Sequence, residues 1–372
     1  MKLPKKYIFP LLILIFAVSI RSGEIPTVTA DNCLRILDIN VWSGLDYEGY
    51  IKMGEYETDL VREKRYQALI AQIRQLDPDI IGLHEANKLP HYAKRLAKDI
   101  GYDVFYHVGV GGVRLGPVGL PWNLREGDAI LTKHDLNPQF VKRKQLSGGF
   151  VGKWATFHFS DATQIIAIRI TCRDKPVYLF ATHWHASLSG ASPILEKAEV
   201  MHNAGEITGE EYQNILTQIK EGVAWRLSES KKTIEFIKER AMDHPYILMG
   251  DFNAGPESQE IRNLIGFGMV DLFQGSNPDS TGFTWDPGTN LNQKEHYLHE
   301  SFTEKDINAY TRLECFSRKI PTRIDYIFLG PSSGLAAEKI SIQSSKVVMR
   351  EIIHGVHASD HYGVFAEIQI NP

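Results

Sequence analysis

The chain has 372 residues, of which 43% are hydrophobic and 23% are charged. This composition is ordinary for a globular protein and excludes the disordered and fibrous classes. Lys and Arg number 41 against 45 Asp and Glu, so the formal net charge at pH 7 is -4. The protein therefore lacks the bulk positive charge that grips nucleic acid, and its substrate has to be inferred from a site.

The N-terminal segment has the pattern of an export signal. Lysines precede the apolar run Tyr7–Ile20, which is shorter than the roughly 20 apolar residues that span a bilayer. Pro10 interrupts the run, and Val28–Ala30 offers small residues for cleavage. We therefore predict a cleaved signal peptide over residues 1–30, a mature chain of residues 31–372, and a secreted or periplasmic location.

The rest of the chain alternates short apolar runs with helical patterns, and no polar linker divides it. We therefore expect one large α/β domain. Periodic apolar positions predict helices over Lys64–Leu76, His91–Asp99 and part of Gly209–Asp243. The predicted strands are Leu34–Ile39, Ile80–Leu83, Asp128–Thr132, Lys153–Phe159, Gln164–Ile170, Val177–Ala181, Tyr246–Met249, Ile324–Leu329 and Val364–Ile370.

Three further segments are assigned to connecting or peripheral structure. The glycine-rich segment Val108–Gly119 matches neither dinucleotide-binding nor P-loop spacing and is predicted to be a flexible loop. The basic run Lys142–Lys144 is predicted to be a solvated turn. Residues near 190–230 are interpreted as a helical insertion that shapes the mouth of a substrate site.

Acid, amide and imidazole side chains cluster at the ends of the predicted strands. Strand ends are where several strands can deliver side chains into one cleft. Each such residue alone has an ordinary explanation, such as a turn cap or an ion pair, but the ordered series predicts one shared site. Its members are Asn40, Glu85, His183, Asp251, Asn253, Asp325, Asp360 and His361.

Two other histidines are given supporting roles. His84 points away from Glu85 if that segment is extended, since successive side chains of a strand face opposite sides. We therefore interpret His84 as structural. His185 follows His183 by two residues, and we expect it to support His183 rather than to bind a metal.

The segments that carry the predicted site resemble, in order, the motifs of the endonuclease/exonuclease/phosphatase superfamily, which includes deoxyribonuclease I and neutral sphingomyelinases. These segments are ILDINVWSG, IIGLHEANK, YLFATHWHA, YILMGDFNAGPES, RIDYIFL and HASDHYGVF. The resemblance implies an α/β fold of four layers, an αββα sandwich with two mixed β-sheets packed face to face. It also implies metal-assisted hydrolysis of a phosphoester.

The resemblance implies a metal site at the first two motifs and the last. Glu85 is the first expected ligand, with Asn40 and Asp360 nearby. The expected cofactor is Mg²⁺ or another divalent cation such as Mn²⁺, because hard cations prefer oxygen ligands and keep several waters.

The resemblance also implies the catalytic roles of the remaining residues. His361, oriented by Asp325, is expected to accept the proton of the attacking water. His183 and Asn253 are expected to donate hydrogen bonds to the phosphate oxygens, and Asp251 to orient the water or the leaving group. The sequence leaves open whether Asp251 or His361 removes the proton.

The substrate class depends on looser resemblances. The stretch Thr284–Asn290 resembles a segment of secreted sphingomyelinases, and Gly222–Trp225 and Thr182–Ala186 are similar to segments of neutral sphingomyelinases. We therefore expect a phosphodiesterase of sphingomyelinase (phospholipase C) type, a monomer that acts on a lipid head group and contacts a membrane surface transiently.

Three alternatives to a lipid substrate stay open. The first is an extracellular endonuclease of deoxyribonuclease I type that acts on nucleic acid. The second is a phosphomonoesterase of inositol phosphates or nucleotides, and the third is a noncatalytic binding module on the same fold. The complete set of site residues argues against the binding module, which has no need of all of them.

Overall fold

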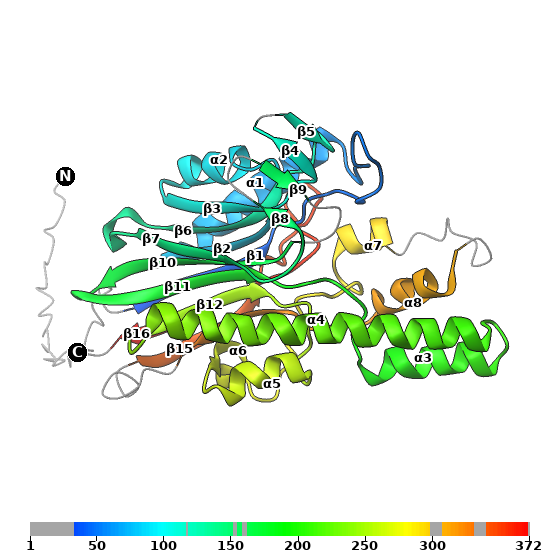
Figure 1. Ribbon diagram of the computed structural model, residues 1–372. Helices are drawn as coiled ribbons and strands as arrows, with labels where there is room; N and C mark the ends of the chain where they lie inside the picture. Colours follow the sequence, from blue (N-terminus) through cyan, green and yellow to red (C-terminus); the bar gives the residue numbers. More distant parts are fainter. Residues whose placement is uncertain are drawn as a thin grey trace, which may run out of the picture. The chain divides into compact units, whose positions relative to one another are not determined.

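Two stacked β-sheets form the centre of the computed structural model, which describes residues 33–116, 118–151, 155–157, 162–297, 307–330 and 340–370. The predicted signal peptide lies outside the described residues and stays a prediction. Helices cover the outer surface of each sheet (Figure 1). The expected four-layer αββα sandwich is therefore confirmed.

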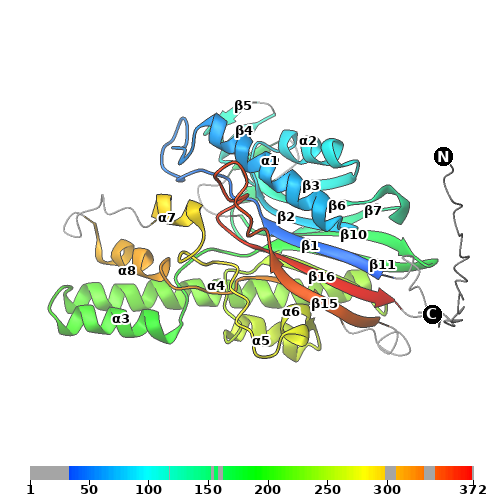
Figure 2. The ribbon, with the colours of Figure 1, turned by 180° about the vertical axis from the view of Figure 1, so that it is seen from behind.

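The first sheet has the strand order β15-β16-β1-β2-β6-β3. Strand β1 is parallel to β2 and antiparallel to β16, so the sheet is mixed, as expected. Helices α1 and α2 pack on its outer face (Figure 2). The elements are β1 (Cys33–Asn40), α1 (Asp59–Leu76), β2 (Ile80–Ala86), α2 (His91–Ile100), β3 (Asp103–Val110), β6 (Glu126–Thr132), β15 (Ile340–Val348) and β16 (Gly363–Ile370).

The second sheet has the order β13-β14-β12-β11-β10-β7, and β11 is parallel to β12. Helices α4 and α5 pack on its outer face through residues such as Phe236 and Ile261. The elements are η2 (His134–Leu136), β7 (Gln139–Gln145), β10 (Gln164–Cys172), β11 (Lys175–His183), α4 (Gly209–Ala241), β12 (Tyr246–Asp251), α5 (Gln259–Gly266), β13 (Val270–Asp271), α6 (Leu272–Ser276), α7 (Leu291–Tyr297) and β14 (Asp325–Leu329).

The main core lies between the two sheets. Its side chains are mostly β-branched, as at Ile36, Ile80, Ile168 and Ile327, and each of these is fully buried. Alternate residues of a strand face the same side, so the same strands present a second apolar set to the helices. A sheet that is buried on both faces needs short, continuous apolar runs, which is why the strand predictions for these segments hold.

A helical lobe extends from the second sheet. Helix α4 packs on β11 and extends past the ends of the strands, where α3 (Ser192–Asn203) and α8 (Ala309–Ser317) pack against it (Figure 1). The lobe has its own apolar cluster, which includes Ile194, Ile215 and Leu313. Within the part of the chain that the structure describes, none of these helices is long and apolar enough to cross a membrane.

A small third sheet corrects the prediction of a flexible loop over Val108–Gly119. That segment contains the end of β3, all of β4 and the start of β5. Glycines supply the left-handed turn positions, and the residues between them alternate as a strand requires. The sheet has the order β5-β4-β9-β8, with β4 (Val113–Leu115), β5 (Val118–Leu120), β8 (Phe150–Val151) and β9 (Ala155–Phe157).

The predicted solvated turn at Lys142–Lys144 is also wrong, because these residues lie inside β7. Strand β7 is the last strand in the order of the second sheet. Charged side chains are typical of such edge strands, since they deter pairing with other chains. The basic run therefore belongs to an edge strand of the sheet rather than to a loop.

We predict that Gly82→Ala destabilises the fold. A Cβ atom at Gly82 would lie 2.4 Å from Asp38 Oδ1 and 3.2 Å from Met249 Cβ, between the two sheets. Overpacking of this kind costs about 1–3 kcal/mol, which urea denaturation would measure. Gly266→Ala is the control, because nothing lies within 4 Å of that position; equal stabilities of the two variants would contradict the prediction.

Candidate active site

The predicted site residues come from both sheets and meet at one end of the sandwich. Asn40 and Asp251 end β1 and β12, and Asp325 begins β14. His183, Asp251 and Asp325 are direct neighbours across three adjacent strands. A cleft of about 900 Å³ opens here, and its lining includes Glu85, Asp251, Asn253, Asp360 and His361.

Asn40 links the two sheets at the bottom of the site. Its Nδ2 donates to Glu85 Oε1 at 2.8 Å and to Asp251 Oδ2 at 3.0 Å. Its Oδ1 accepts a hydrogen bond from the Trp42 backbone nitrogen at 2.9 Å. That nitrogen can only donate, which fixes the orientation of the amide. Asn40 therefore donates to two carboxylates that belong to different sheets.

Glu85 occupies a bulge in β2. The pairing of β2 with β6 shifts between Leu83 and Ala86, and Glu85 has φ +54. Positive φ is uncommon for a residue with a side chain, and bulges often re-aim side chains beside active sites. The second carboxylate oxygen of Glu85 accepts from the Ser43 backbone nitrogen at 3.2 Å. The bulge thus directs Glu85 toward the residues of the other sheet.

His361 and Asp325, which the sequence predicts to be a proton acceptor and its partner, lie within hydrogen-bonding distance. His361 Nδ1 lies 2.9 Å from Asp325 Oδ2 and 3.8 Å from Asp251 Oδ2. Burial raises the pKa of Asp325. Burial opposes a charge on His361, but Asp325 and Asp251 outweigh it and raise the pKa of the imidazole well above its ordinary value. The imidazolium form of His361 is therefore stabilised by this site.

His183 and Asn253 form the opposite side of the site. His183 Nε2 lies 3.0 Å from Asn253 Nδ2 and 3.6 Å from Asp251 Oδ2. Asn253 Nδ2 also donates to the Trp184 carbonyl at 2.9 Å. Burial opposes the charge of Asp251, but His183 and His361 outweigh it and lower the pKa of this carboxyl. Asp251 is therefore held as a carboxylate between two imidazoles.

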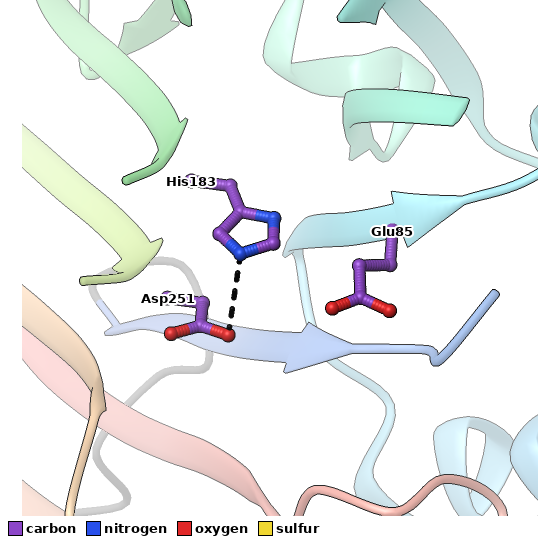
Figure 3. Close-up of side chains that lie close together, drawn as sticks. All are labelled: Glu85, His183 and Asp251. Carbon is purple, nitrogen blue, oxygen red and sulfur yellow. Dashed lines mark ion pairs between the residues drawn. The ribbon is translucent and has the colours of Figure 1, made fainter. Parts of the chain in front are cut away.

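Two groups of side chains have ligand atoms close enough to hold a metal ion. Glu85, His183 and Asp251 form one group, and they point toward one another from three strands (Figure 3). Asp251, Asp325 and His361 form the other, and the ligand atoms of each group lie within 4.8 Å of one another. Carboxylate oxygens dominate both groups, which fits a divalent cation.

Asp360, which the sequence also placed at the metal, belongs to neither group. Its Oδ1 accepts from the Ser359 hydroxyl at 3.2 Å, and it lines the cleft. His185 stacks on Trp225, with ring centroids 3.9 Å apart, and is not part of a metal group within the described chain. Its interpretation as a supporting residue is therefore compatible with the structure.

The structure adds residues that the sequence reasoning did not assign to the site. Trp285 packs edge-on against His361, with ring centroids 5.2 Å apart, and Thr284 Oγ1 accepts from the backbone nitrogen of Asp325. Both residues belong to the stretch Thr284–Asn290, whose sequence served only to infer the substrate class. The helical lobe also borders the cleft through Ile194 and Val223, as expected of the insertion near residues 190–230.

The sequence matches the model of the Endonuclease/Exonuclease/phosphatase family over residues 39–361. The chain belongs to this family. The family comprises hydrolases of phosphoesters, as its name states, and the six motif segments that resemble it all contribute to the site. No curated protein matches the chain.

Solved structures show the same fold at low sequence identity. D. rerio TDP2 complexed with a single-strand DNA product is 16% identical, with a TM-score of 0.56, and the match covers 91% of this chain and 100% of that one. A family member from Bacteroides thetaiotaomicron is 16% identical, with a TM-score of 0.53 and coverage of 91% and 98%. The human Nocturnin catalytic domain with bound sulfate is 13% identical, with a TM-score of 0.51 and coverage of 91% and 95%.

We predict that His361→Ala lowers kcat by about 10²–10⁴-fold, the usual contribution of a general base. Hydrolysis of a soluble phosphodiester such as bis(4-nitrophenyl) phosphate would measure the loss. His244→Ala is the control, because His244 stacks on Tyr178 near the start of β12, at the opposite end of that strand from Asp251. Unchanged turnover in His361→Ala would remove this residue from the catalytic set.

Proposed function

We propose that this protein is an exported, Mg²⁺-dependent phosphodiesterase of sphingomyelinase (phospholipase C) type. The observation that carries the hydrolytic part is the His361–Asp325 pair, 2.9 Å apart, in the same cleft as Glu85 and Asp251. A noncatalytic binding module has no need of a buried imidazole that lines a cleft and is paired with a carboxylate, since burying such charges is costly.

The residues of the site have different roles in the proposed hydrolysis. Glu85 and Asp251 would hold the cation, which when bound polarises the phosphate and activates water. The neutral form of His361 takes the proton of the attacking water, and Asp325 stabilises the imidazolium that results. His183 belongs to the candidate metal group and Asn253 lines the cleft; both would donate hydrogen bonds to the phosphate oxygens as negative charge grows on them.

An exposed apolar sheet face supports a lipid as the substrate. On the small third sheet, Leu120 pairs with Val113, Val113 with Phe157, and Phe157 with Phe150. Directly paired residues lie on one face of a sheet. Leu120, Phe150 and Phe157 are 50%, 64% and 59% exposed, so this row, which we call the apolar face, is open to solvent. Exposed apolar patches are typical of protein or membrane contacts.

Trp122, two residues after the end of β5, contacts a loop that reaches the cleft. The Trp122 backbone nitrogen donates to the Ile51 carbonyl, and both side chains are exposed. The same loop carries Tyr47, which lines the cleft and donates to Glu126. Aromatic residues with a polar end are enriched where proteins meet the lipid interface. Such a surface would bring the cleft to lipid head groups in a transient membrane contact.

Nucleic acid is the second candidate substrate. It is favoured by the D. rerio structure of the same fold, which is complexed with a single-strand DNA product. The net charge of -4 weighs against it, because nucleic-acid binding depends on neutralising phosphates with Lys and Arg.

We predict that the full chain with Mg²⁺ releases phosphocholine from sphingomyelin vesicles and that a chelator stops the release. Plasmid DNA assayed in parallel should stay intact. Nicking of DNA without phosphocholine release would make the protein an endonuclease instead. Inactivity on both, with hydrolysis of soluble phosphomonoesters, would support the phosphatase alternative, and inactivity on all three would support the binding module.

We predict that Leu120→Lys and Phe157→Lys each lower vesicle hydrolysis at least about tenfold and reduce co-sedimentation with the vesicles, because a charge disfavours insertion into the apolar interface. Hydrolysis of soluble bis(4-nitrophenyl) phosphate should stay unchanged. Val200→Lys is the control, since Val200 is 57% exposed on α3 of the helical lobe. Equal vesicle hydrolysis in all variants would exclude the apolar face as the contact.

A further inference from the structure

His84 is a buried histidine that the proposed chemistry does not use. It is fully buried, as is Asp38, and Asp128 is 3% exposed. His84 Nε2 lies 2.9 Å from Asp38 Oδ1, and His84 Nδ1 lies 3.0 Å from Asp128 Oδ1. Both ring nitrogens are therefore paired with carboxylates, one on each neighbouring strand of the first sheet.

These two contacts fasten the bulge that carries Glu85. In the pairing of β2 with β6, Leu83 faces Ala129 and Ala86 faces Gly127. His84 and Glu85 therefore oppose a single residue, Asp128, which is the arrangement that defines a bulge. The Asp128 side chain contacts His84, the first residue of the bulge. Glu85, the second residue, has φ +54, and its side chain turns into the cleft.

The contact on the other side ties the bulge to β1. Asp38 and Asn40 lie two residues apart on that strand and therefore share a face. Asp38 bonds His84, and Asn40 bonds Glu85 at 2.8 Å. Gly82 leaves the space for this arrangement, since a Cβ atom there would lie 2.4 Å from Asp38 Oδ1. Two parallel side-chain contacts thus join β1 to successive residues of the bulge.

His84 also contacts the far side of the site. Its ring lies edge-on to the His183 ring, with centroids 6.3 Å apart and an interplanar angle of 72°. His183 belongs to the second sheet, where it is paired with Asp251. The ring of His84 therefore packs beneath a residue that shares a candidate metal group with Glu85.

We propose that His84, held between Asp38 and Asp128, is a positioning residue that sets the geometry of Glu85 and His183 for divalent-cation binding. The inference rests on the proposed function, because it needs Glu85 to be a metal ligand. Partners of this kind, one contact removed from a metal, change metal affinity by about 10–100-fold when they are altered.

The test measures Mn²⁺ binding by isothermal titration calorimetry with the full chain, so that the readout is independent of catalysis. His84→Gln and Asp128→Asn should each weaken Mn²⁺ binding by about 10–100-fold, with lower kcat and unchanged KM for a soluble phosphodiester. Circular dichroism and a thermal unfolding scan would show that each variant is folded. His134→Gln is the matched control, because it breaks an exposed His–Asp pair of 2.9 Å.

Glu85→Gln separates failure of the inference from failure of the proposed function. If Glu85→Gln weakens Mn²⁺ binding while folded His84→Gln and Asp128→Asn bind as tightly as the original protein, the inference is overturned and the metal site stands. If Glu85→Gln binds Mn²⁺ normally, the metal site and the inference both fail. If His84→Gln does not fold, Asp128→Asn decides. If neither variant folds, the role of His84 is in folding and the inference is overturned.

Discussion

The hydrogen bonds of Asn40 join the two sheets at the candidate active site. Glu85 and Asp251 come from different sheets, and two carboxylates in one site repel each other unless donors or cations lie between them. The Asn40 amide donates to both, at 2.8 and 3.0 Å, while the Trp42 backbone fixes its orientation. The rest of the site depends on this contact, because it sets the spacing of the carboxylates before any cation binds.

In each sheet, buried carboxylates are paired with a histidine side chain. In the first sheet, Asp38 and Asp128 contact the two ring nitrogens of His84. Asp325 and Asp251 of the second sheet both approach the Nδ1 atom of His361, at 2.9 and 3.8 Å. An isolated buried carboxylate is costly, so each is stabilised by an imidazole. One imidazole faces the cleft and the other lies beneath it. The need to stabilise buried carboxylates therefore accounts for both histidines, the candidate base His361 and the candidate positioning residue His84.

The surroundings of the cleft are built from different elements than the site itself. The helical lobe borders it through Ile194 and Val223, and the loop that carries Tyr47 borders it too and is bonded to the backbone of Trp122, two residues after β5. Chemistry that is shared by a fold serves many substrates through such peripheral segments. The sandwich and its polar residues thus fit the phosphoester hydrolysis of the family, and we propose that the lobe and the small third sheet influence which phosphoester is hydrolysed.

The sequence by itself determined the buried strands and the set of polar residues at their ends, because a strand covered on both faces needs an uninterrupted apolar run that a polar residue visibly ends. It did not reveal β3, β7 or β15, whose partly exposed residues lack such runs. Nor did it reveal the role of His84, whose partners lie 46 and 44 residues away. An extended strand places His84 and Glu85 on opposite faces, and only strand pairing creates the bulge that turns Glu85 into the cleft. Tertiary structure decided that step, because a bulge is a mismatch between two strands rather than a property of one.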